Sequence, residues 1–241
     1  MSALFNEILY RPFLNALVFL YNTVAIEDIG IAIILLTLVI RFALFPIFQK
    51  AMVHQRLSQE IQPRIKKIQE KHKNDKEAQA KEIFALYAEY KINPFTPFLL
   101  LLVQLPVLIA LYQVFRNVAS GAEQFGSLYS FVHAPAQLEL SFLGAFDLAA
   151  PSIALALVAA GAQFIQTKLS LSRVKKAPGN PDTAEMMGKM MLFIGPGMTL
   201  AILWHFPAAI GLYWLTTTIF SIIQQVIVNK GRYEGSGEKN K

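Results

Sequence analysis

Long stretches without a charged side chain constrain this sequence more than any other feature. Residues 95–115 and 148–167 contain no Asp, Glu, Lys or Arg, and neither do residues 190–228. A helix needs about 20 apolar residues to cross a hydrocarbon core about 30 Å thick. Only 16% of the chain is charged, whereas soluble domains carry about 25%. These features predict an integral membrane protein.

The third uncharged run, at 39 residues, is too long for a single span. It divides at His205-Phe206-Pro207, because proline cannot donate a backbone hydrogen bond to a continuing helix. An apolar segment at 29–48 adds a further candidate, so we expect an all-α fold with a five-helix transmembrane core. The expected spans are 29–48, 95–117, 148–168, 190–205 and 207–228.

The N-terminal segment has a different character. Residues 12–26 (PFLNALVFLYNTVAI) are apolar but shorter than a span, and Asn15, Tyr21 and Asn22 interrupt them. We interpret them as an amphipathic helix in the membrane interface, although a re-entrant segment would have a similar sequence. Glu7 breaks the first apolar stretch, so a cleavable signal peptide is not expected. The chain has no cysteine, which excludes disulfides and Cys-based metal sites.

The distribution of Lys and Arg predicts the orientation. Residues 49–94 hold ten of the 22 basic residues and residues 168–189 hold five, whereas residues 119–147 hold none. Basic loops face the cytoplasm under the positive-inside rule. We therefore expect an outer N-terminus and a cytoplasmic C-terminus. The expected outer segments are 1–28 and 118–147, and the expected cytoplasmic segments are 49–94, 169–189 and 229–241.

The cytoplasmic insert shows helical periodicity. Two sets of apolar residues recur at spacings of three and four: Leu57, Ile61, Ile65 and Ile68, then Ile83, Leu86, Tyr87 and Tyr90. Lys73-Asn74-Asp75 between them suits a turn and a helix cap. The pattern predicts an antiparallel helical hairpin kinked at Pro63. Two amphipathic helices resting on lipid headgroups would show the same periodicity.

Arg41 is an isolated cation within the apolar segment LTLVIRFALFP. An arginine at this depth costs from about 2.5 to more than about 10 kcal/mol. Its side chain could extend toward headgroups about 10 Å away along the helix, or it could face a hydrated cavity between helices. Thr37 precedes Arg41 by four residues and shares its helix face, which favours the cavity.

The other expected spans also carry polar side chains but no acidic residue. The polar residues are Gln104, Gln163, Gln166, Trp214, Thr217, Thr218, Ser221, Gln224 and Gln225. For a lone Thr or Gln, an interhelical hydrogen bond is the simpler explanation. Arg41 lacks a counter-ion inside the spans, and a buried cation without one needs water or a visiting anion. We expect a bound partner to bring that anion.

No motif for catalysis appears. The four His residues are scattered, and GxSxG, HExxH and phosphate-loop patterns are absent. We therefore expect no catalytic residue, no metal site and no cofactor. The net charge of +6 is attributed to topology and to affinity for anionic lipids, and no direct, specific nucleic-acid site is expected.

Four segments together resemble the YidC/Oxa/Alb family of membrane protein insertases. They are TLVIRFALFP, ALYAEYKINPF, LLLLVQLPVLIALYQVF and LWHFPAAIGLYWLTTTIFSIIQQ, in family order. The resemblance implies a five-helix core around a hydrophilic groove that is open to cytosol and lipid. It also implies an N-terminal interfacial helix and a cytoplasmic hairpin. The expected groove residues are Arg41, Thr37, Gln104, Gln163, Tyr213, Trp214, Thr217 and Ser221, with Gln166 an equal alternative to Gln163.

The resemblance further implies a function. We expect an insertase and chaperone of the bacterial inner membrane that integrates nascent membrane proteins. Expected partners are those clients, the ribosome, the Sec translocon and anionic lipids. The alternatives are a small-solute or anion transporter that uses Arg41, and a scaffold for membrane complexes. Transporters usually contain internal repeats, and none is visible in this sequence.

Overall fold

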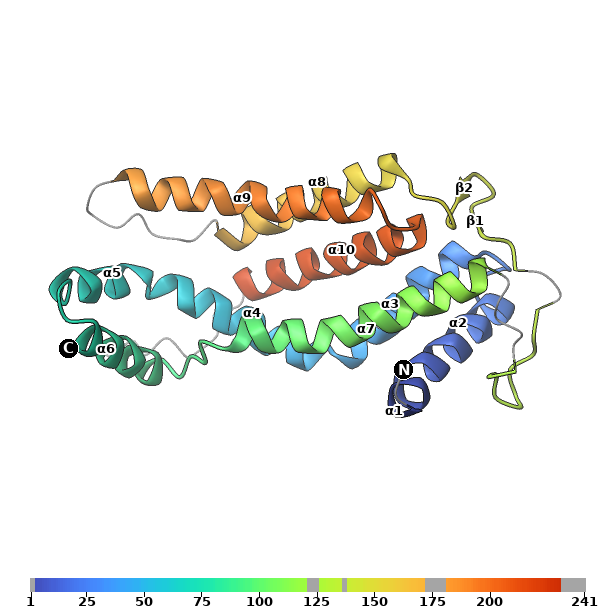
Figure 1. Cartoon of the computed structure of the whole chain (residues 1–241), viewed down its shortest axis with the longest axis horizontal. Helices are drawn as coiled ribbons and strands as arrows, with labels where there is room; N and C mark the ends of the chain where they lie inside the picture. Colours follow the sequence, from blue (N-terminus) through green and yellow to red (C-terminus); the bar gives the residue numbers. More distant parts are fainter. Residues whose placement is uncertain (1–2, 121–125, 136–137, 172–180, 231–241) are drawn as a thin grey trace.

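The structure is a computed structural model that describes residues 3–120, 126–135, 138–171 and 181–230. Apart from one short β-hairpin, its elements are helices (Figure 1). The helices are α1 (Ala3–Phe5), η1 (Asn6–Tyr10), α2 (Arg11–Thr23), α3 (Ile29–Ala43), α4 (Phe45–Glu60), α5 (Gln62–Lys71), α6 (Lys76–Glu89), α7 (Thr96–Ala119), α8 (Ile153–Leu171), α9 (Pro181–Leu203) and α10 (Ala208–Lys230). The strands β1 (Ser141–Phe142) and β2 (Phe146–Asp147) pair in antiparallel fashion.

The long helices form an elongated bundle with α10 at its centre. Figure 1 shows α10 running between the pair α8 and α9 and the pair α3 and α7. Half of the apolar window of α10 is buried inside the protein, compared with 17% for α8. Ile210 and Leu212 of α10 are buried in the main core with Leu36 of α3. The outer helices therefore leave most of their apolar side chains available to lipid.

The fold is that of an all-α membrane protein, as the sequence predicts. Four helices of the described chain are long and apolar enough to cross a membrane: Ala3–Thr23, Phe98–Ala119, Ile153–Leu171 and Ala208–Asn229. The bent pair α3 and α4 would make a fifth. The fourth predicted span corresponds to a shorter apolar helix, Leu192–Leu203.

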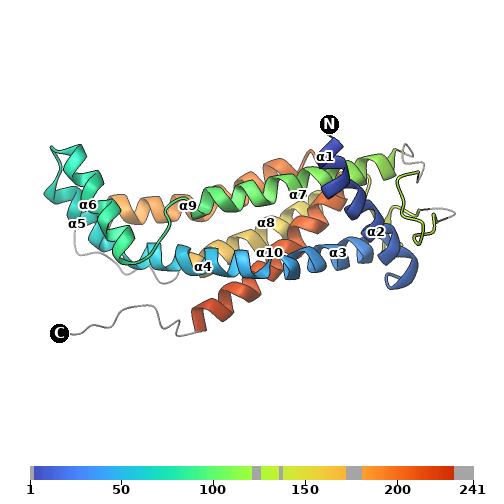
Figure 2. The same ribbon diagram turned by 90° about the horizontal axis from the view of Figure 1, so that it is seen from below.

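The N-terminal helix is longer than expected. Elements α1, η1 and α2 run without a break as a helix of 21 residues. The prediction that this segment is too short to span the membrane is therefore wrong about its length. Pro12 lies in the first turn of α2, and the π-helical turn η1 precedes it. Proline cannot donate a backbone hydrogen bond, and a π turn is a local change of hydrogen-bond register within a helix. Both views show α2 crossing the long axis of the bundle obliquely (Figures 1 and 2), and its interfacial location stays a prediction.

The predicted span 29–48 is two helices, since the chain bends by 68° after Ala43. Pro46 lies in the first turn of α4, where its missing N–H is tolerated and a new helix axis starts. Helix α4 then continues to Glu60, well past the predicted end of the span. At the other end of α3, Asp28 caps the helix by accepting a hydrogen bond from the Ile31 N–H at 2.8 Å.

The predicted cytoplasmic hairpin is present as α5 and α6. The chain breaks at Ile61, and Pro63 lies in the first turn of α5. The Asp75 side chain caps α6 through the Ala78 N–H at 2.9 Å. The apolar stripes of the two arms meet in a small separate core made of Ile61, Ile65, Ile68, Leu86 and Ile92. The stripes therefore pack against each other.

Helix α9 begins at Pro181, nine residues before the predicted fourth span. The predicted loop 169–189 is accordingly helical at both ends, because α8 continues to Leu171. Residues 172–180 lie outside the described chain, as do residues 231–241 of the predicted tail. Pro196 lies inside α9.

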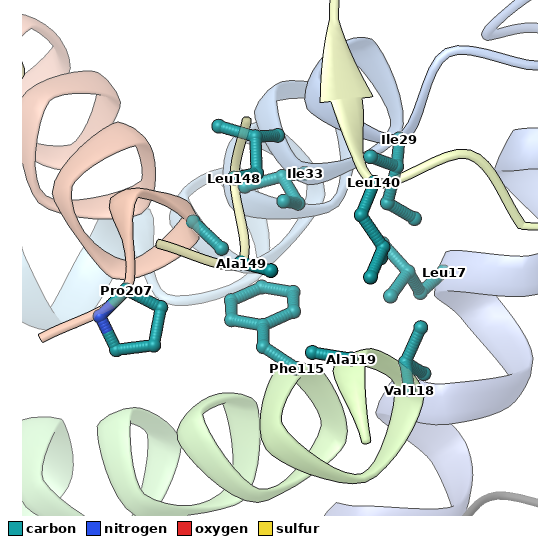
Figure 3. A pocket seen from close by; sticks show the side chains of 11 residues that line it. Leu17, Ile29, Ile33, Phe115, Val118, Ala119, Leu140, Leu148, Ala149 and Pro207 are labelled. Carbon is teal, nitrogen blue, oxygen red and sulfur yellow. The ribbon is translucent and has the colours of Figure 1, made fainter. Parts of the chain in front are cut away.

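Apolar side chains surround a small pocket at the end of the bundle that holds the β-hairpin, which the charge distribution predicts to be the outer end (Figure 3). Its walls include Leu17 of α2, Ile33 of α3, Phe115 of α7 and Pro207 before α10. The β-hairpin packs onto the same end: its Leu143 N–H donates a hydrogen bond to Asp28 at 2.6 Å.

Candidate functional site

Arg41 is buried in the last turn of α3, with 6% of its surface exposed. Its guanidinium carbon lies 4.2 Å from the centre of the Phe48 ring on α4, a distance suited to a cation–π contact. Nη1 is buried without a hydrogen-bond partner. Within the described residues, no carboxylate lies within ion-pair distance of Arg41. The structure therefore holds a buried cation whose charge is not neutralised.

Tyr213 and Gln104 lie beside this cation. Tyr213 of α10 is 3% exposed, and its phenol is close enough to interact electrostatically with Arg41. The Gln104 side-chain amide on α7 donates a hydrogen bond to the Tyr213 hydroxyl. The two residues thus bring α7 and α10 together beside the cation on α3.

The hydroxyl groups of the site mostly bond to their own helices. Thr37 Oγ1 donates to the Ile33 carbonyl at 2.6 Å, and Ser221 Oγ donates to the Thr217 carbonyl at 2.9 Å. Such bonds are common for Ser and Thr within helices. They use the hydroxyl hydrogen and leave the oxygen as an acceptor. Thr217 Oγ1 is an exception, because it is buried, donates to no carbonyl of its own helix and lies beside the Tyr213 hydroxyl.

Two predicted site residues lie elsewhere or have a different role. Trp214 is half-buried and packs against the main core. Gln163 lies on α8 against α9: its Nε2 is 3.8 Å from the position that a Cβ on Gly195 would take. Figure 1 shows α10 between that helix pair and α3. The contact that the structure gives for Gln163 is thus with α9, and its place among the groove residues stays a prediction.

Sequence reasoning did not select Gln224 and Phe48 as site residues. Gln224 is 1% exposed, and both atoms of its amide head lack a hydrogen-bond partner. Its spacing of seven residues from Thr217 places both on one helix face, which is a signal that the sequence contains. Phe48 also follows Arg41 by seven residues, and its ring lies over the guanidinium across the bend after Ala43.

In the part of the chain that the structure describes, no group of three or more His, Asp or Glu residues could hold a metal ion. The bundle of long apolar helices, with a buried cation and an amphipathic hairpin beyond them, defines a multi-pass helical membrane protein.

Comparison with known proteins agrees with this class and gives the family. The family model described as "60Kd inner membrane protein" matches residues 19–236. A curated relative from Clostridium tetani, named membrane protein insertase YidC, is 35% identical over 88% of this chain and 86% of its own length. A YidC from Geobacter sp. is 31% identical over 91% of this chain but only 36% of its own length. The chain thus belongs to the YidC/Oxa family of 60Kd inner membrane proteins.

A solved structure supports the fold. The crystal structure described as an active YidC insertase with its first transmembrane domain resolved aligns with a TM-score of 0.60. The alignment covers 95% of this chain and 47% of that chain at 23% identity. The two proteins therefore share the helical bundle, and the present chain spans about half of the solved one.

Proposed function

We propose that this protein inserts client proteins into the membrane, the activity that the names of its YidC relatives state for them. The observation that carries the proposal is the buried Arg41 without a counter-ion. A permanent protein partner would have placed a carboxylate beside it. A transient client with an acidic or polar segment supplies that partner only during its passage.

In this proposal, polar residues of α3, α7 and α10 line a hydrophilic groove within the membrane. The groove residues are Arg41, Thr37, Gln104, Tyr213, Thr217 and Ser221. The apolar pocket at the outer end supports a groove that is closed on that side. The basic loops support an open end that faces the cytosol, with the N-terminus outside and the C-terminus inside.

The proposed mechanism changes no covalent bond. A polar outer segment of the client enters the groove, where Arg41 and bound water reduce the cost of desolvating it. The apolar segment of the client then moves past Trp214 into lipid. Its burial contributes about 25 cal/mol per Å² of apolar surface. The energy for insertion thus comes from the client itself.

The partners follow from the same scheme. The hairpin of α5 and α6 and the basic segment 169–189 would meet the client first. A ribosome or a Sec translocon would deliver it. The lysines of the cytoplasmic loops would bind anionic lipid headgroups. Gln163 remains a candidate contact on the α8 and α9 side of α10.

Reconstitution with purified clients tests the proposal. Liposomes containing the protein should integrate a single-span client, and Arg41→Ala should slow clients with acidic outer tails about tenfold, equivalent to about 1.4 kcal/mol. Clients with neutral tails should be affected much less. Arg116, an exposed arginine at the outer end of α7, gives the control Arg116→Ala, which should insert both classes at the wild-type rate.

The same liposomes address the alternatives. An anion transporter would also need an unpaired cation, and it would move solute without client. A scaffold would do neither. Equal insertion of acidic and neutral clients by wild type and Arg41→Ala would refute the electrostatic role.

A further inference from the structure

Two adjacent glutamines of α10 have opposite surroundings. Gln225 is buried, and its Nε2 donates to Asn229 Oδ1 at 3.1 Å. Asn229 in turn donates to the Leu169 carbonyl of α8 at 3.3 Å. Gln224 is buried more deeply, at 1% exposure, yet its Nε2 and Oε1 both lack a partner. The chain therefore satisfies one amide within the fold and leaves the other unused.

Gln224 lies on the side of α10 that faces α4. Four residues before it, the Phe220 ring contacts the Phe45 ring of α4, with centroids 6.4 Å apart. Four residues after it, the Val228 carbonyl accepts a hydrogen bond from Arg56 of α4 at 2.7 Å. The Phe220 ring also contacts the Phe42 ring of α3, with centroids 5.2 Å apart. Because residues four apart share one face of a helix, Gln224 lies on the face of α10 that meets the junction of α3 and α4.

Leaving both polar atoms of a buried amide unpaired costs stability, whereas an apolar side chain of similar shape would cost little. Leucine would fill much of this volume without that cost. The presence of glutamine is therefore best explained by a partner that is absent from the folded chain alone. That partner must offer both a donor and an acceptor, because the carboxamide has an NH2 group that donates and a carbonyl oxygen that accepts.

The peptide group has this complementary pair of a donor and an acceptor. Thr217 Oγ1, also buried, lies two turns before Gln224 on the same face, about 10 Å along the helix, and its oxygen can accept a further hydrogen bond. An extended chain covers about 10 Å in three residues. Main-chain groups of one extended segment can therefore reach both Thr217 and Gln224, irrespective of the side chains of that segment.

We propose that Gln224 binds the main chain of the client, in extended conformation, where it passes between α4 and α10. The inference rests on the proposed insertase function and names the feature of the client that the inner end of the site recognises. The client reaches Gln224 by separating α4 from α10. Recognition of the main chain explains how one site accepts clients of unrelated sequence.

Paired variants of the full chain in liposomes test this inference. Gln224→Leu should insert a purified single-span client about tenfold more slowly, with a melting temperature equal to or above that of the wild type. Gln225→Leu is the matched control: it should melt at a lower temperature and insert at the wild-type rate while folded. Wild-type insertion by Gln224→Leu, or a lower melting temperature together with its slower insertion, would overturn the inference.

A second measurement tests the main chain directly. Synthetic clients in which single amides are replaced by esters lose one N–H donor at a chosen position. At one or two positions the ester should slow the wild-type protein several-fold and leave Gln224→Leu unaffected. Ester effects of equal size in both proteins would show that Gln224 contacts side chains or water, and would refute the proposal. If the wild-type protein inserts no client at all, the proposed function itself fails.

Discussion

The two ends of the bundle differ in whether their buried amide side chains have hydrogen-bond partners. At the outer end, Asn15 of α2 is 2% exposed and fully engaged. Its Nδ2 donates to the Arg11 and Ser127 carbonyls at 2.7 and 3.1 Å, and its Oδ1 accepts from the Tyr129 N–H at 2.6 Å. At the inner end, the amide of Gln224 has no partner.

This difference distinguishes a structural buried amide from one that is available to a partner. Asn15 and Gln224 carry the same chemical group at similar depth of burial. Asn15 fastens the loop after α7 to α2, so its role is structural. Gln224 and Arg41 have unused hydrogen-bonding atoms, for which we propose partners from outside the chain. Under this proposal the outer end stays closed and the inner end binds the client.

The strongest test of this contrast is Asn15→Leu. The change leaves the Tyr129 N–H without its partner and removes one donor to the Ser127 carbonyl. Each orphaned buried group costs about 1–3 kcal/mol, so we expect a loss of about 3 kcal/mol. Unfolding in detergent micelles would measure it. A loss below about 1 kcal/mol would show that the outer end does not depend on this amide.

Gly30→Ala tests the closure at a second point. A Cβ at Gly30 would lie 2.2–2.7 Å from the Phe142 side chain of the β-hairpin, so the ring must move. We expect destabilisation of about 2 kcal/mol, typical of overpacking, measured by the same unfolding experiment. Adding Phe142→Ala to Gly30→Ala should recover part of the stability. A wild-type value for Gly30→Ala alone would mean that the hairpin is loosely held.

Arg41→Met should act in the opposite direction. Methionine keeps a long, adaptable side chain over the Phe48 ring and removes an uncompensated buried charge. Replacing buried charge by apolar groups is often neutral or stabilising, so we expect a gain of about 1 kcal/mol in unfolding free energy. Insertion of acidic-tailed clients should fall in the same variant. Clear destabilisation would place Arg41 among the structural residues.

The smallest effect concerns the hairpin beyond the inner end. Glu82 accepts hydrogen bonds from Lys71 at 3.0 and 3.2 Å and contacts His72 at 2.5 Å. These contacts, that of Lys71 first, lower the pKa of Glu82 below its ordinary value. The contribution of Glu82 to hairpin stability is therefore complete above the ordinary pKa of a glutamate. It is lost as the pH falls through the lower pKa of the folded state.

Hydrogen exchange of the α5 and α6 amides against pH would measure this effect. Glu82→Gln should make protection less dependent on pH in the acid range. Glu77→Gln, at an exposed site in the first turn of α6, should keep the wild-type profile. Identical profiles for Glu82→Gln and wild type would show that Glu82 does not contribute to the stability of the hairpin.

Much of the fold could be predicted from the sequence because it follows local rules. Charge-free runs fix the apolar helices, and the periodicity around Ile65 and Leu86 correctly predicts that two arms meet. The 68° bend after Ala43 was missed because the apolar run continues past it to Phe48, so the span was predicted as one helix. The length of the N-terminal helix was missed because Glu7 and Arg11, which pair with each other at 3.1 Å, interrupt the apolar stretch, and only residues 12–26 were considered.

The site was predictable where it depends on one helix and less so where it depends on packing. Thr37 and Arg41 share a face by spacing alone, and both are buried in the structure. Gln163 lies against Gly195 because of how α8 pairs with α9, which no spacing within one helix reveals. The unused amide of Gln224 depends on α4 passing over α10. That arrangement depends on the bend before α4.

The ring that covers Arg41 belongs to α4, the first segment beyond the bend and the base of the hairpin. Because Phe48 lies just beyond the 68° bend, a change in the angle between α3 and α4 would move this ring relative to the guanidinium. In the proposed insertion scheme, a client that tilts α4 would thereby alter how strongly the buried charge attracts it.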